Sequence, residues 1–595
     1  MNILAIQEGH TATAALSKNG EIIGSVSEER FLRKKNWEGY PRNAITYLSG
    51  LVNGQIDKVV LCGQLTPGVS IVGREHNFSV LDHINQQREN FYPIYYKNQN
   101  PFITQKNYFK KIIKEKKRKL QDTQFLFNKN FKFTCDPSID INRFNKVRVE
   151  TISRQLNIPR KNIIFLDHHI GHVYYAYYAS PFRKKNCLVI TADGDGDYGI
   201  NATVSIVKND KITEIFRTDK QPIAKLWRYF TLMLGMKPQQ HEYKVMGMAP
   251  YADPNISNFV YKVLKSHFSV NNLKFVTKKK PKDLYFYFRN LFEGVRFDGL
   301  AGGLQKWTEE MTKRWIENII KKTKISRIVL SGGLSMNIKA NKIVNEIKDV
   351  KEFFVPASGG DESLPIGGCY YLSSKFSKPK PLNNIYLGPK YNDDQIKKIF
   401  TTSAKKFKIV KIKSLDEVSR LLKKGLIVAR FSGRMEFGAR ALGNRSILAN
   451  PSLPETLKKI NSKIKQRDFW MPFTPIILKE NKKDYIIDKK NTSCPHMTIA
   501  FDTTPLGRNH FKAAIHPYDQ TVRPQILEKK HNQNLYNLIK SFKKVSGIGG
   551  ILNTSFNLHG FPIVCNPKDA IETLKKSDLD GVLFNDKFLV MRKRK

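Results

Sequence analysis

The sequence predicts an α/β fold, because segments with the pattern of strands alternate with segments with the pattern of helices. Apolar runs typical of buried strands occur at 162–166, 187–192 and 327–331. A further strand-like run follows at 201–207, and 303–322 has the spacing of an amphipathic helix. The run at 327–331 leads through two glycines into a helical pattern at 334–347.

The N-terminal segment 3–31 predicts paired strands. Its apolar and small residues alternate, and Lys18-Asn19-Gly20 separates two strand-like runs. Asn-Gly favours a tight hairpin turn, since both residues tolerate a positive φ. We therefore expect the chain to begin with a hairpin.

The domain organisation follows from composition. Residues 66–155 are polar and aromatic-rich, and they predict a mostly helical or loop-like insertion. A proline-spaced stretch at 376–391 predicts a linker, so we expect one domain at 1–375 and a second α/β or α+β domain at 392–595. No internal repeat is detectable.

Composition restricts the protein class. A chain of 595 residues with 41% hydrophobic residues can form two to four domains. The six cysteines form no CxxC pair, the N-terminus does not have the pattern of a secretory signal, and no apolar run reaches the roughly 18 residues of a membrane span. We expect a soluble, cytoplasmic protein that has no membrane partner.

The formal charge of +49 has two interpretations. It favours anionic ligands such as nucleotides or nucleic acid. Alternatively, a lysine-rich background composition raises the charge without a specific partner, which the solvated runs at 110–120 and 278–283 favour.

Three histidines follow the strand at 162–166, in the stretch "LDHHIGH". His168 and His172 are four residues apart, so on a helix that starts near Asp167 they project from one face. The spacing alone fits either packed imidazoles at a helix start or two ligands of a metal.

Glycine-rich turns end three strands. Asp193, Asp195 and Asp197 alternate with glycines in "ADGDGDYG", which suits a metal or phosphate site but also an ordinary loop. Gly332-Gly333 precede Asn337 and Asn341 in "GGLSMNIKAN", a geometry for nucleotide binding or a simple strand–helix turn. Asp361 in "VPASGGDES" is by itself unremarkable.

Together these motifs resemble the O-carbamoyltransferase family (NodU/TobZ/CmcH-like). The order HxxxH, DGxGD, GGxxxNxxxN and PxxxxD resembles its ASKHA-type (actin/sugar-kinase-like) domain. The resemblance extends through "EERFLRKK", "YKVMGMAPYADP", "GRMEFGARALGNRSILANP", "YDQTVRPQ" and "LNTSFNLHGFPIVCNPKDAI". It covers nearly the whole chain except 66–155 and parts of 253–300, and it implies a YrdC-like second domain that forms carbamoyl adenylate from carbamoyl phosphate and ATP.

The resemblance implies a metal at the histidine motif. Its ligands would be His168, His172, Asp193 and Asp361, and the metal Fe(II), although a mixed N/O site also suits Mn and other divalent ions. His169 would pack or support the ligands. Mg²⁺ is a further candidate ion beside ATP.

The arginines of the second domain fit anionic substrates, because planar guanidinium groups bind phosphate and carboxyl oxygens in pairs. Arg434, Arg440 and Arg445 lie in one glycine-punctuated segment. Surface salt bridges are the alternative. By the resemblance, the residues that hold nucleotide or carbamoyl phosphate are Lys35, Gly333, Asn337, Arg434, Arg467, Arg523, Asn553 and Ser555.

The expected reaction transfers the carbamoyl group to an acceptor hydroxyl. His10 is the candidate general base or acceptor-binding residue, with Asp193 as the second catalytic candidate; a structural histidine at a strand end is the rival for His10. We expect a small-molecule acceptor (a sugar, nucleoside or natural product), with nucleic acid as the less favoured alternative. The oligomeric state stays open, with a homodimer as one option.

Several positions depart from the family pattern. Thr11 replaces an aspartate, Asn36 a histidine, Ala224 a glycine and Tyr243 the glycine of "EGK" beside Glu242. Met471 replaces an arginine, so that another residue such as Lys465 would have to supply the missing anion contact. Met471 is also the sequence support for a further alternative, a nucleotide-binding protein that has lost catalysis.

Overall fold

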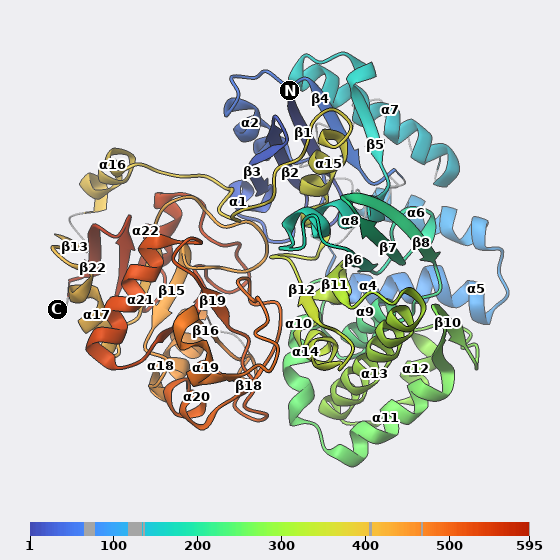
Figure 1. Ribbon diagram of the computed structural model, residues 1–595. Coiled ribbons are helices and arrows are strands. Elements are labelled where there is room, and N and C mark those ends of the chain that lie inside the picture. The colour runs from blue at the N-terminus through green and yellow to red at the C-terminus, as the bar shows by residue number, and fades with distance from the viewer. Residues whose placement is uncertain (65–77, 117–133, 135–136, 404–406, 466–467, 594–595) are drawn as a thin grey trace. The chain divides into compact units, whose positions relative to one another are not determined.

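The structure is a computed structural model that describes residues 1–64, 78–116, 134, 137–403, 407–465 and 468–593. The chain forms two units (Figure 1). The first unit contains Met1–Glu29, Asn36–Lys351 and Gly359–Pro381, and the second contains Arg30–Lys35, Glu352–Ser358 and Leu382–Lys595. Two short segments, 30–35 and 352–358, thus join the second unit, which the sequence patterns did not indicate.

The first sheet of the first unit has the order β3-β2-β1-β4-β5. Strands β1, β4 and β5 are parallel, and β2 and β3 are antiparallel to their neighbours. The predicted hairpin turn is confirmed, with Asn19 at φ 49° and Gly20 at φ 76° between β2 and β3. The strands are β1 (Asn2–Gln7), β2 (Thr13–Lys18), β3 (Glu21–Ser27), β4 (Lys58–Cys62) and β5 (Ile163–Leu166).

The second sheet repeats this topology, with the order β12-β11-β6-β7-β8; its edge strand β12 comes from the segment 352–358, which groups with the second unit. Again the first strand along the chain, β6, lies at the centre, with an antiparallel pair on one side and a parallel neighbour on the other. This duplicated α/β arrangement confirms the predicted fold class and agrees with the ASKHA-type fold that the resemblance implied. The strands are β6 (Cys187–Ala192), β7 (Ala202–Lys208), β8 (Lys211–Thr218), β11 (Arg327–Ser331) and β12 (Glu352–Phe354).

Two helices that hold the site cross at glycines. Helix α8 (His168–Ala179) packs on α15 (Leu364–Ser373), and α15 packs on β1, β2 and β4. A Cβ on Gly367 would lie 1.8 Å from the carbonyl oxygen of Gly171, so only glycine allows this approach. The crossing therefore brings the start of α8 close to the residues that precede α15.

The segment predicted as an insertion, 66–155, is largely helical where it is described. Its last helix, α7, carries a completely buried Phe144 and Arg148. The guanidinium of Arg148 pairs with Glu8, which follows β1. This helix is therefore part of the core of the first unit. The described helices of the segment are α4 (Val80–Gln86), α5 (Tyr92–Tyr96), α6 (Pro101–Lys116) and α7 (Pro137–Leu156).

The remaining helices of the first unit cover its sheets. The predicted helix at 303–322 is confirmed within α13, which packs against α11 through Gly299 and Gly303. Strands β9 (Phe268–Asn271) and β10 (Lys274–Thr277) form a small hairpin. The helices are α2 (Arg42–Gly50), α9 (Ile223–Met233), α10 (Glu242–Met248), α11 (Pro254–His267), α12 (Phe286–Leu291), α13 (Phe297–Thr323) and α14 (Ile338–Glu346).

The second unit is built on one mixed sheet of order β13-β22-β21-β14-β15-β20-β16-β19. It is an α/β unit, as expected; its likeness to YrdC stays a prediction. The strands are β13 (Phe407–Lys411), β14 (Val428–Phe431), β15 (Arg445–Ala449), β16 (Thr474–Leu478), β19 (Gln525–Leu527), β20 (Gly550–Ser555), β21 (Gly581–Phe584) and β22 (Phe588–Arg592). The helices include α16 (Asp393–Ser403), α17 (Leu415–Lys423), α18 (Pro454–Lys459), α20 (Pro505–His510), α21 (Gln533–Ser546) and α22 (Pro567–Lys575).

The short segment 30–35 is tied into the second unit by arginines. Arg30 donates to the carbonyl oxygen of Gly438 at 3.0 Å. Arg33 donates to the carbonyl oxygens of Pro562 and Ile563, and it lies 3.6 Å from Asp569. These bonds explain why this segment groups with residues more than 400 positions away.

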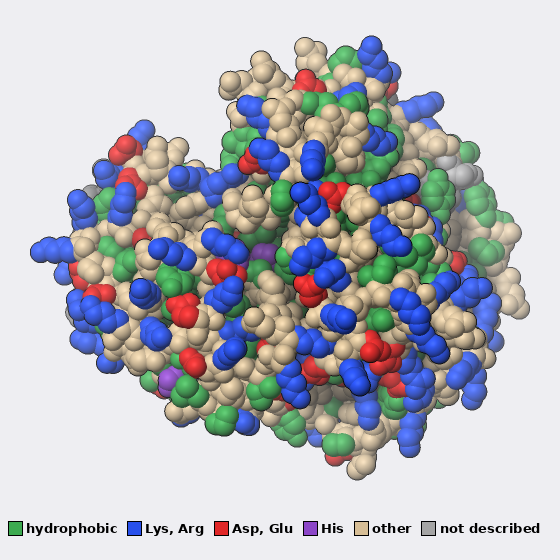
Figure 2. All heavy atoms as spheres, viewed as in Figure 1, with side chains coloured by type: hydrophobic (Ala, Val, Ile, Leu, Met, Phe, Trp, Pro, Cys, Tyr) green, Lys and Arg blue, Asp and Glu red, His purple; other side chains and the backbone are tan. Residues whose placement is uncertain are grey.

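The surface is rich in lysine and arginine. These side chains are scattered over the visible face rather than gathered over one element (Figure 2). Such scatter fits a generally basic composition better than one built anion-binding patch. Among the described residues, none of the helices is both long and apolar enough to cross a bilayer.

Candidate metal centre

The histidine helix begins where the sequence predicts. Strand β5 ends at Leu166, and Asp167 caps α8 by accepting a hydrogen bond from the N–H of Ile170 at 3.0 Å. Arg217 donates to the same carboxylate at 3.0 Å. This cap fixes the first turn, so that His168 and His172 lie on one face, one turn apart.

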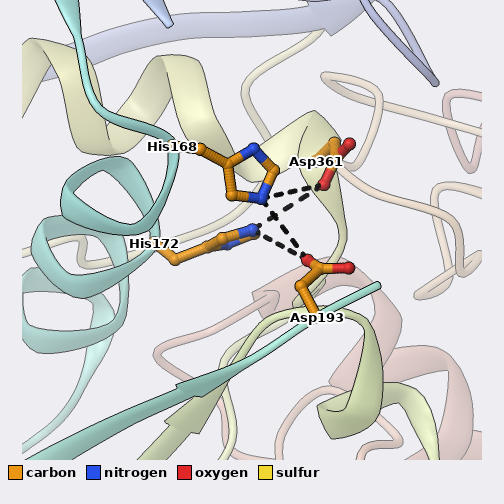
Figure 3. Close-up of side chains that lie close together, drawn as sticks. All are labelled: His168, His172, Asp193 and Asp361. Atoms are coloured by element: carbon orange, nitrogen blue, oxygen red, sulfur yellow. Dashed lines mark ion pairs between the residues drawn. The ribbon is translucent and has the colours of Figure 1, made fainter. Parts of the chain in front are cut away.

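Four side chains converge at this face (Figure 3). His172 Nε2 lies 3.1 Å from Asp193 Oδ2 and 3.7 Å from Asp361 Oδ1. His168 Nε2 lies 3.6 Å from Asp193 Oδ2 and 3.7 Å from Asp361 Oδ1. The ligand atoms of all four residues lie within 4.8 Å of one another.

The four residues fit a metal ion. Both Nε2 atoms are buried, and the polar atoms that face them are the carboxylate oxygens of Asp193 and Asp361. Ligand atoms about 2.0–2.2 Å from a metal are about 3.0–3.6 Å apart, close to the separations found here. Two imidazoles and two carboxylates form a mixed N/O set suited to iron, manganese or zinc.

Without a metal, the two carboxylates favour the protonated forms of His168 and His172. Burial lowers the pKa of His168, but Asp361 and Asp193 outweigh it and raise the pKa to about 9. The same carboxylates raise the pKa of His172 against the effect of burial. Although burial raises the pKa of Asp193, the two imidazoles hold it well below its usual range. A metal ion would displace the imidazole protons and take over their role as counter-charge.

His169 points away from the cluster. Its Nδ1 lies 2.8 Å from Thr191 Oγ1, and its Nε2 lies 3.0 Å from the carbonyl oxygen of Ile200. Burial, together with His168 and His172, lowers the pKa of His169 to about 3. Both ring nitrogens therefore form structural hydrogen bonds, in line with the expectation that His169 packs or supports the ligands.

Backbone groups orient Asp193. The N–H of Gly333 donates to its Oδ2 at 3.1 Å, and the N–H of Gly194 donates to its Oδ1 at 2.7 Å. Gly332 has φ 87°, and a Cβ there would lie 2.3 Å from the carbonyl oxygen of Ala192. Gly333, predicted to bind cofactor, thus lies beside a predicted metal ligand.

Asn337 has structural partners. It caps α14 by accepting from the N–H of Ala340 at 3.0 Å, and its amide exchanges two hydrogen bonds with Gln305. Its predicted contact with nucleotide stays a prediction. Asn341 donates to the carbonyl oxygen of Ser335 and supports the same turn.

His10 lies in the turn between β1 and β2. The next residue, Thr11, has φ 55°, which is uncommon for a β-branched residue. Thr11 Oγ1 donates to Glu362 Oε2 at 3.3 Å, so this turn is bonded to the neighbour of Asp361. His10 therefore stands in a turn that is bonded to the segment carrying the predicted metal ligand Asp361.

Glu242 is a carboxyl group near His10 that the sequence did not single out. It opens α10, and the N–H of Gln239 donates to it at 2.5 Å. Burial raises the pKa of Glu242 to about 7, while the charge of His10 acts in the opposite direction. The signal in the sequence was the "EYK" motif, which by itself does not tell whether the carboxyl is buried.

The predicted anion-binding residues of the second unit have different surroundings. Arg434 is partly exposed and donates to the carbonyl oxygens of Leu387 and Gly388. Asn553 is buried and donates to the carbonyl oxygen of Ala441. Lys35 and Arg523 are partly exposed, and Arg467 lies outside the described residues.

Lys465, which the sequence suggested as a substitute for the arginine missing at 471, lies next to Ser555, one of the predicted site residues. It is buried, and its ammonium donates to the hydroxyl of Ser555 at 3.2 Å and to Asn557. The two residues come from different elements, so the fold brings them together. Met471 is partly buried.

Arg445 differs from the anion-binding arginine that its motif predicted. It is completely buried and donates to the carbonyl oxygens of Ser432 and Pro389, among others. Its guanidinium lies 3.7 Å from the ring centroid of Phe431. The prediction for Arg445 is corrected, because this side chain is enclosed by the fold and not presented to a ligand.

Comparisons with known proteins place these features in a family. The sequence matches the family model "Carbamoyltransferase N-terminus" over residues 2–369 and "Carbamoyltransferase C-terminus" over residues 419–592. The uncharacterized protein MJ1051 of Methanocaldococcus jannaschii is 30% identical over 98% of each chain. Nodulation protein NolO of Bradyrhizobium diazoefficiens is 28% identical over 72% of this chain and 79% of its own.

Solved structures are more distant. Component A of (R)-2-hydroxyglutaryl-CoA dehydratase from Acidaminococcus fermentans is 11% identical, with a TM-score of 0.33, over 63% of this chain and 98% of its own. Full-length HypF in its phosphate- and nucleotide-bound form is 11% identical, with a TM-score of 0.32, over 63% and 56%. Likeness at this level adds nothing to the fold assignment, which rests on the strand order.

Proposed function

Because the chain belongs to the carbamoyltransferase family, we propose that it is an ATP-dependent O-carbamoyltransferase acting on a hydroxyl of a small molecule. The carbamoyl group would be activated as carbamoyl adenylate. The observation that carries this proposal is the cluster of His168, His172, Asp193 and Asp361, where two buried imidazole nitrogens face two carboxylates. These four residues would hold Fe(II) or another divalent metal.

The first reaction would make the adenylate. Water cleaves carbamoyl phosphate into carbamate and phosphate, and a carbamate oxygen then attacks the α-phosphorus of ATP while the bond to pyrophosphate breaks. Positive groups are needed, since two anions must approach each other. The residues proposed to bind these anions are Lys35, Arg434, Lys465, Arg467, Arg523, Asn553 and Ser555.

The second reaction would transfer the carbamoyl group. The acceptor oxygen attacks the carbamoyl carbon, the bond to AMP breaks, and the hydroxyl proton passes to a base. His10 is the proposed base, and it lies close enough to Glu242 for its charge to act on that carboxyl. A bound metal would supply positive charge that stabilises the phosphate oxygens of the leaving group.

The test uses the full-length protein loaded with Fe(II) under reducing conditions. With ATP and carbamoyl phosphate we expect release of pyrophosphate, and with acceptor pools we expect products heavier by about 43 Da, the mass of a carbamoyl group replacing hydrogen. The variant His172→Ala should still release pyrophosphate but form no product. If the parent protein releases no pyrophosphate, the proposal fails; ATP binding without pyrophosphate release would instead support a nucleotide-binding protein that has lost catalysis.

The acceptor class is tested separately. We propose a small-molecule acceptor over nucleic acid; on the face that Figure 2 shows, the lysine and arginine side chains are scattered and form no single basic patch. Transfer to a small molecule should depend only weakly on salt, whereas a nucleic-acid acceptor would show affinity that falls steeply between 50 and 200 mM salt, by roughly a thousandfold or more. A steep fall would overturn the small-molecule assignment but not carbamoyl transfer.

A further inference from the structure

A buried ion pair lies behind the turn that carries His10. Arg148 of α7 and Glu8 are both fully buried, with no exposed side-chain surface. Removing two charges from water costs several kcal/mol per ion, so a buried pair by itself is weak evidence of added stability. The further contacts of Arg148 show which groups this pair could hold in position.

Arg148 also bonds to the loop after β4. Its Nη1 donates to the carbonyl oxygen of Gly63 at 3.0 Å and to Asn145 Oδ1 at 3.1 Å. Asn145 Nδ2 in turn donates to the carbonyl oxygen of Gln64 at 2.9 Å. One side of α7 thus holds the backbone of residues 63–64.

The same loop reaches the metal ligands through Asp197. The N–H of Gln64 donates to Asp197 Oδ1, and the N–H of His168 donates to Asp197 Oδ2, each at 2.9 Å. Asp197 is the third aspartate of the "DGDGD" motif, and it is not one of the four metal ligands. Its carboxylate bridges two backbone N–H groups from different segments.

We propose that Arg148 and Asp197 are positioning residues that tie the metal ligand His168 to the turn that carries His10. The continuous path runs through Glu8, Arg148, Asn145, Gln64 and Asp197. Loss of a group that hydrogen-bonds to a metal ligand typically lowers metal affinity by about 10- to 100-fold. Breaking this chain of hydrogen bonds, here called the tie, should therefore weaken metal binding and make the His10 turn more mobile. Its consequence for carbamoyl transfer rests on the proposed function.

The first experiment measures metal affinity without turnover, by titrating the full-length metal-free protein with Co²⁺ and following its visible absorption. Asn145→Asp keeps an acceptor for Arg148 but removes the donor to Gln64. Asp197→Asn leaves one acceptor for two N–H groups. We expect both variants to bind Co²⁺ about 10-fold more weakly than the parent.

The matched control is Arg183→Lys, which alters another arginine–carboxylate pair of the first unit, with Asp210 at 3.3 Å, outside the tie. It should lower thermal stability without a change in Co²⁺ affinity. In Arg148→Lys the ammonium keeps the positive charge but cannot donate to Glu8, Gly63 and Asn145 with the geometry of a guanidinium. Its Co²⁺ affinity should therefore fall as for Asn145→Asp. Affinities of the tie variants within twofold of the parent, in folded protein, would overturn the proposal.

A second measurement needs no metal. Hydrogen exchange followed by mass spectrometry should show faster exchange, by about 10-fold, in the peptide that contains the His168 amide when Asn145 is changed to Asp. Asn145 does not bond to that peptide directly, so the effect must pass through Gln64 and Asp197. An unchanged exchange rate would contradict the proposed hydrogen-bond path from Asn145 to His168. A parent protein that fails to bind Co²⁺ would instead count against the metal part of the proposed function.

Discussion

The glycine crossing of α8 and α15 gives a quantitative prediction, tested by Gly367→Ala. The new Cβ would lie 1.8 Å from the carbonyl oxygen of Gly171, whereas ordinary contact begins at 3.4 Å, so the two helices must separate by about 1.6 Å. Helix α8 carries His172 and the residues before α15 include Asp361, now 3.7 Å apart. Because metal–ligand distances vary by only about 0.2 Å, the variant should bind the proposed metal more weakly and be less stable.

The size of the effect follows from the same contact. Overpacking typically costs about 1–3 kcal/mol, and here the obstacle is backbone, which cannot rotate away, so we expect about 3 kcal/mol or more. Co²⁺ affinity should fall by at least about 10-fold. Both are measured on the purified variant, by chemical denaturation and by absorption titration.

Gly171→Ala is the matched control at the same crossing. Its Cβ would meet the Leu364 side chain at 3.0 Å, which can shift by a few tenths of an ångström. We expect a cost below about 1.5 kcal/mol and nearly unchanged affinity. If Gly367→Ala behaves like Gly171→Ala, the crossing does not set the spacing of the ligands.

Three further predictions concern charges and imidazoles. Burial raises the pKa of Glu242 from 4.5 to about 7, so between these pH values the folded state binds more protons than the unfolded state. The stability of the parent protein therefore falls as the pH rises from 4.5 to 7. Glutamine does not titrate, so the stability of Glu242→Gln relative to the parent should rise by up to about 3 kcal/mol between pH 4 and pH 8, measured by denaturant unfolding. Arg430→Met should cost about 3–5 kcal/mol in urea unfolding, because Asp586 would remain buried without its partner. His172→Gln should lose Co²⁺ binding, whereas His169→Gln should keep it, since the ring of His169 bonds elsewhere; absorption titration distinguishes them.

Each of these has a clear contrary result. A stability difference between Gln and Glu at position 242 that stays constant with pH would mean that the carboxyl is well solvated. Lys587→Met is the control for Arg430, since the pair of Lys587 with Asp393 is exposed and should contribute less than about 1 kcal/mol. Equal costs for the two variants would contradict the argument from burial. Loss of metal in His169→Gln would mean that its ring orients the cluster.

Local patterns predicted the elements that carry the site. The i, i+4 spacing of His168 and His172 and the strand-end position of Asp193 depend on neighbouring residues alone, and the hairpin at Asn19 and Gly20 is a local turn. Asp361 required the family resemblance, because nothing near it in the sequence distinguishes it from other loop aspartates.

Long-range partners could not be predicted in the same way. Glu8 and Arg148 are 140 residues apart, and their pairing appears only once α7 packs behind β1. Arg445 has the same residue type as a phosphate-binding arginine, but its partners are backbone carbonyls, which leave no mark in a sequence. The repeated strand order could not be predicted either. Apolar alternation identifies strands but does not say which strands pair, and many unrelated sequences share the same alternation.

The second unit is not one continuous stretch of the gene. A fragment encoding 382–595 would omit Arg30 and Arg33, and with them the donors to the carbonyl oxygens of Gly438, Pro562 and Ile563. It would also lack Val355, whose carbonyl oxygen accepts from Thr498 at 3.0 Å. Exchange of this unit between relatives by recombination therefore has to carry three separate pieces of coding sequence, which favours inheritance of both units together.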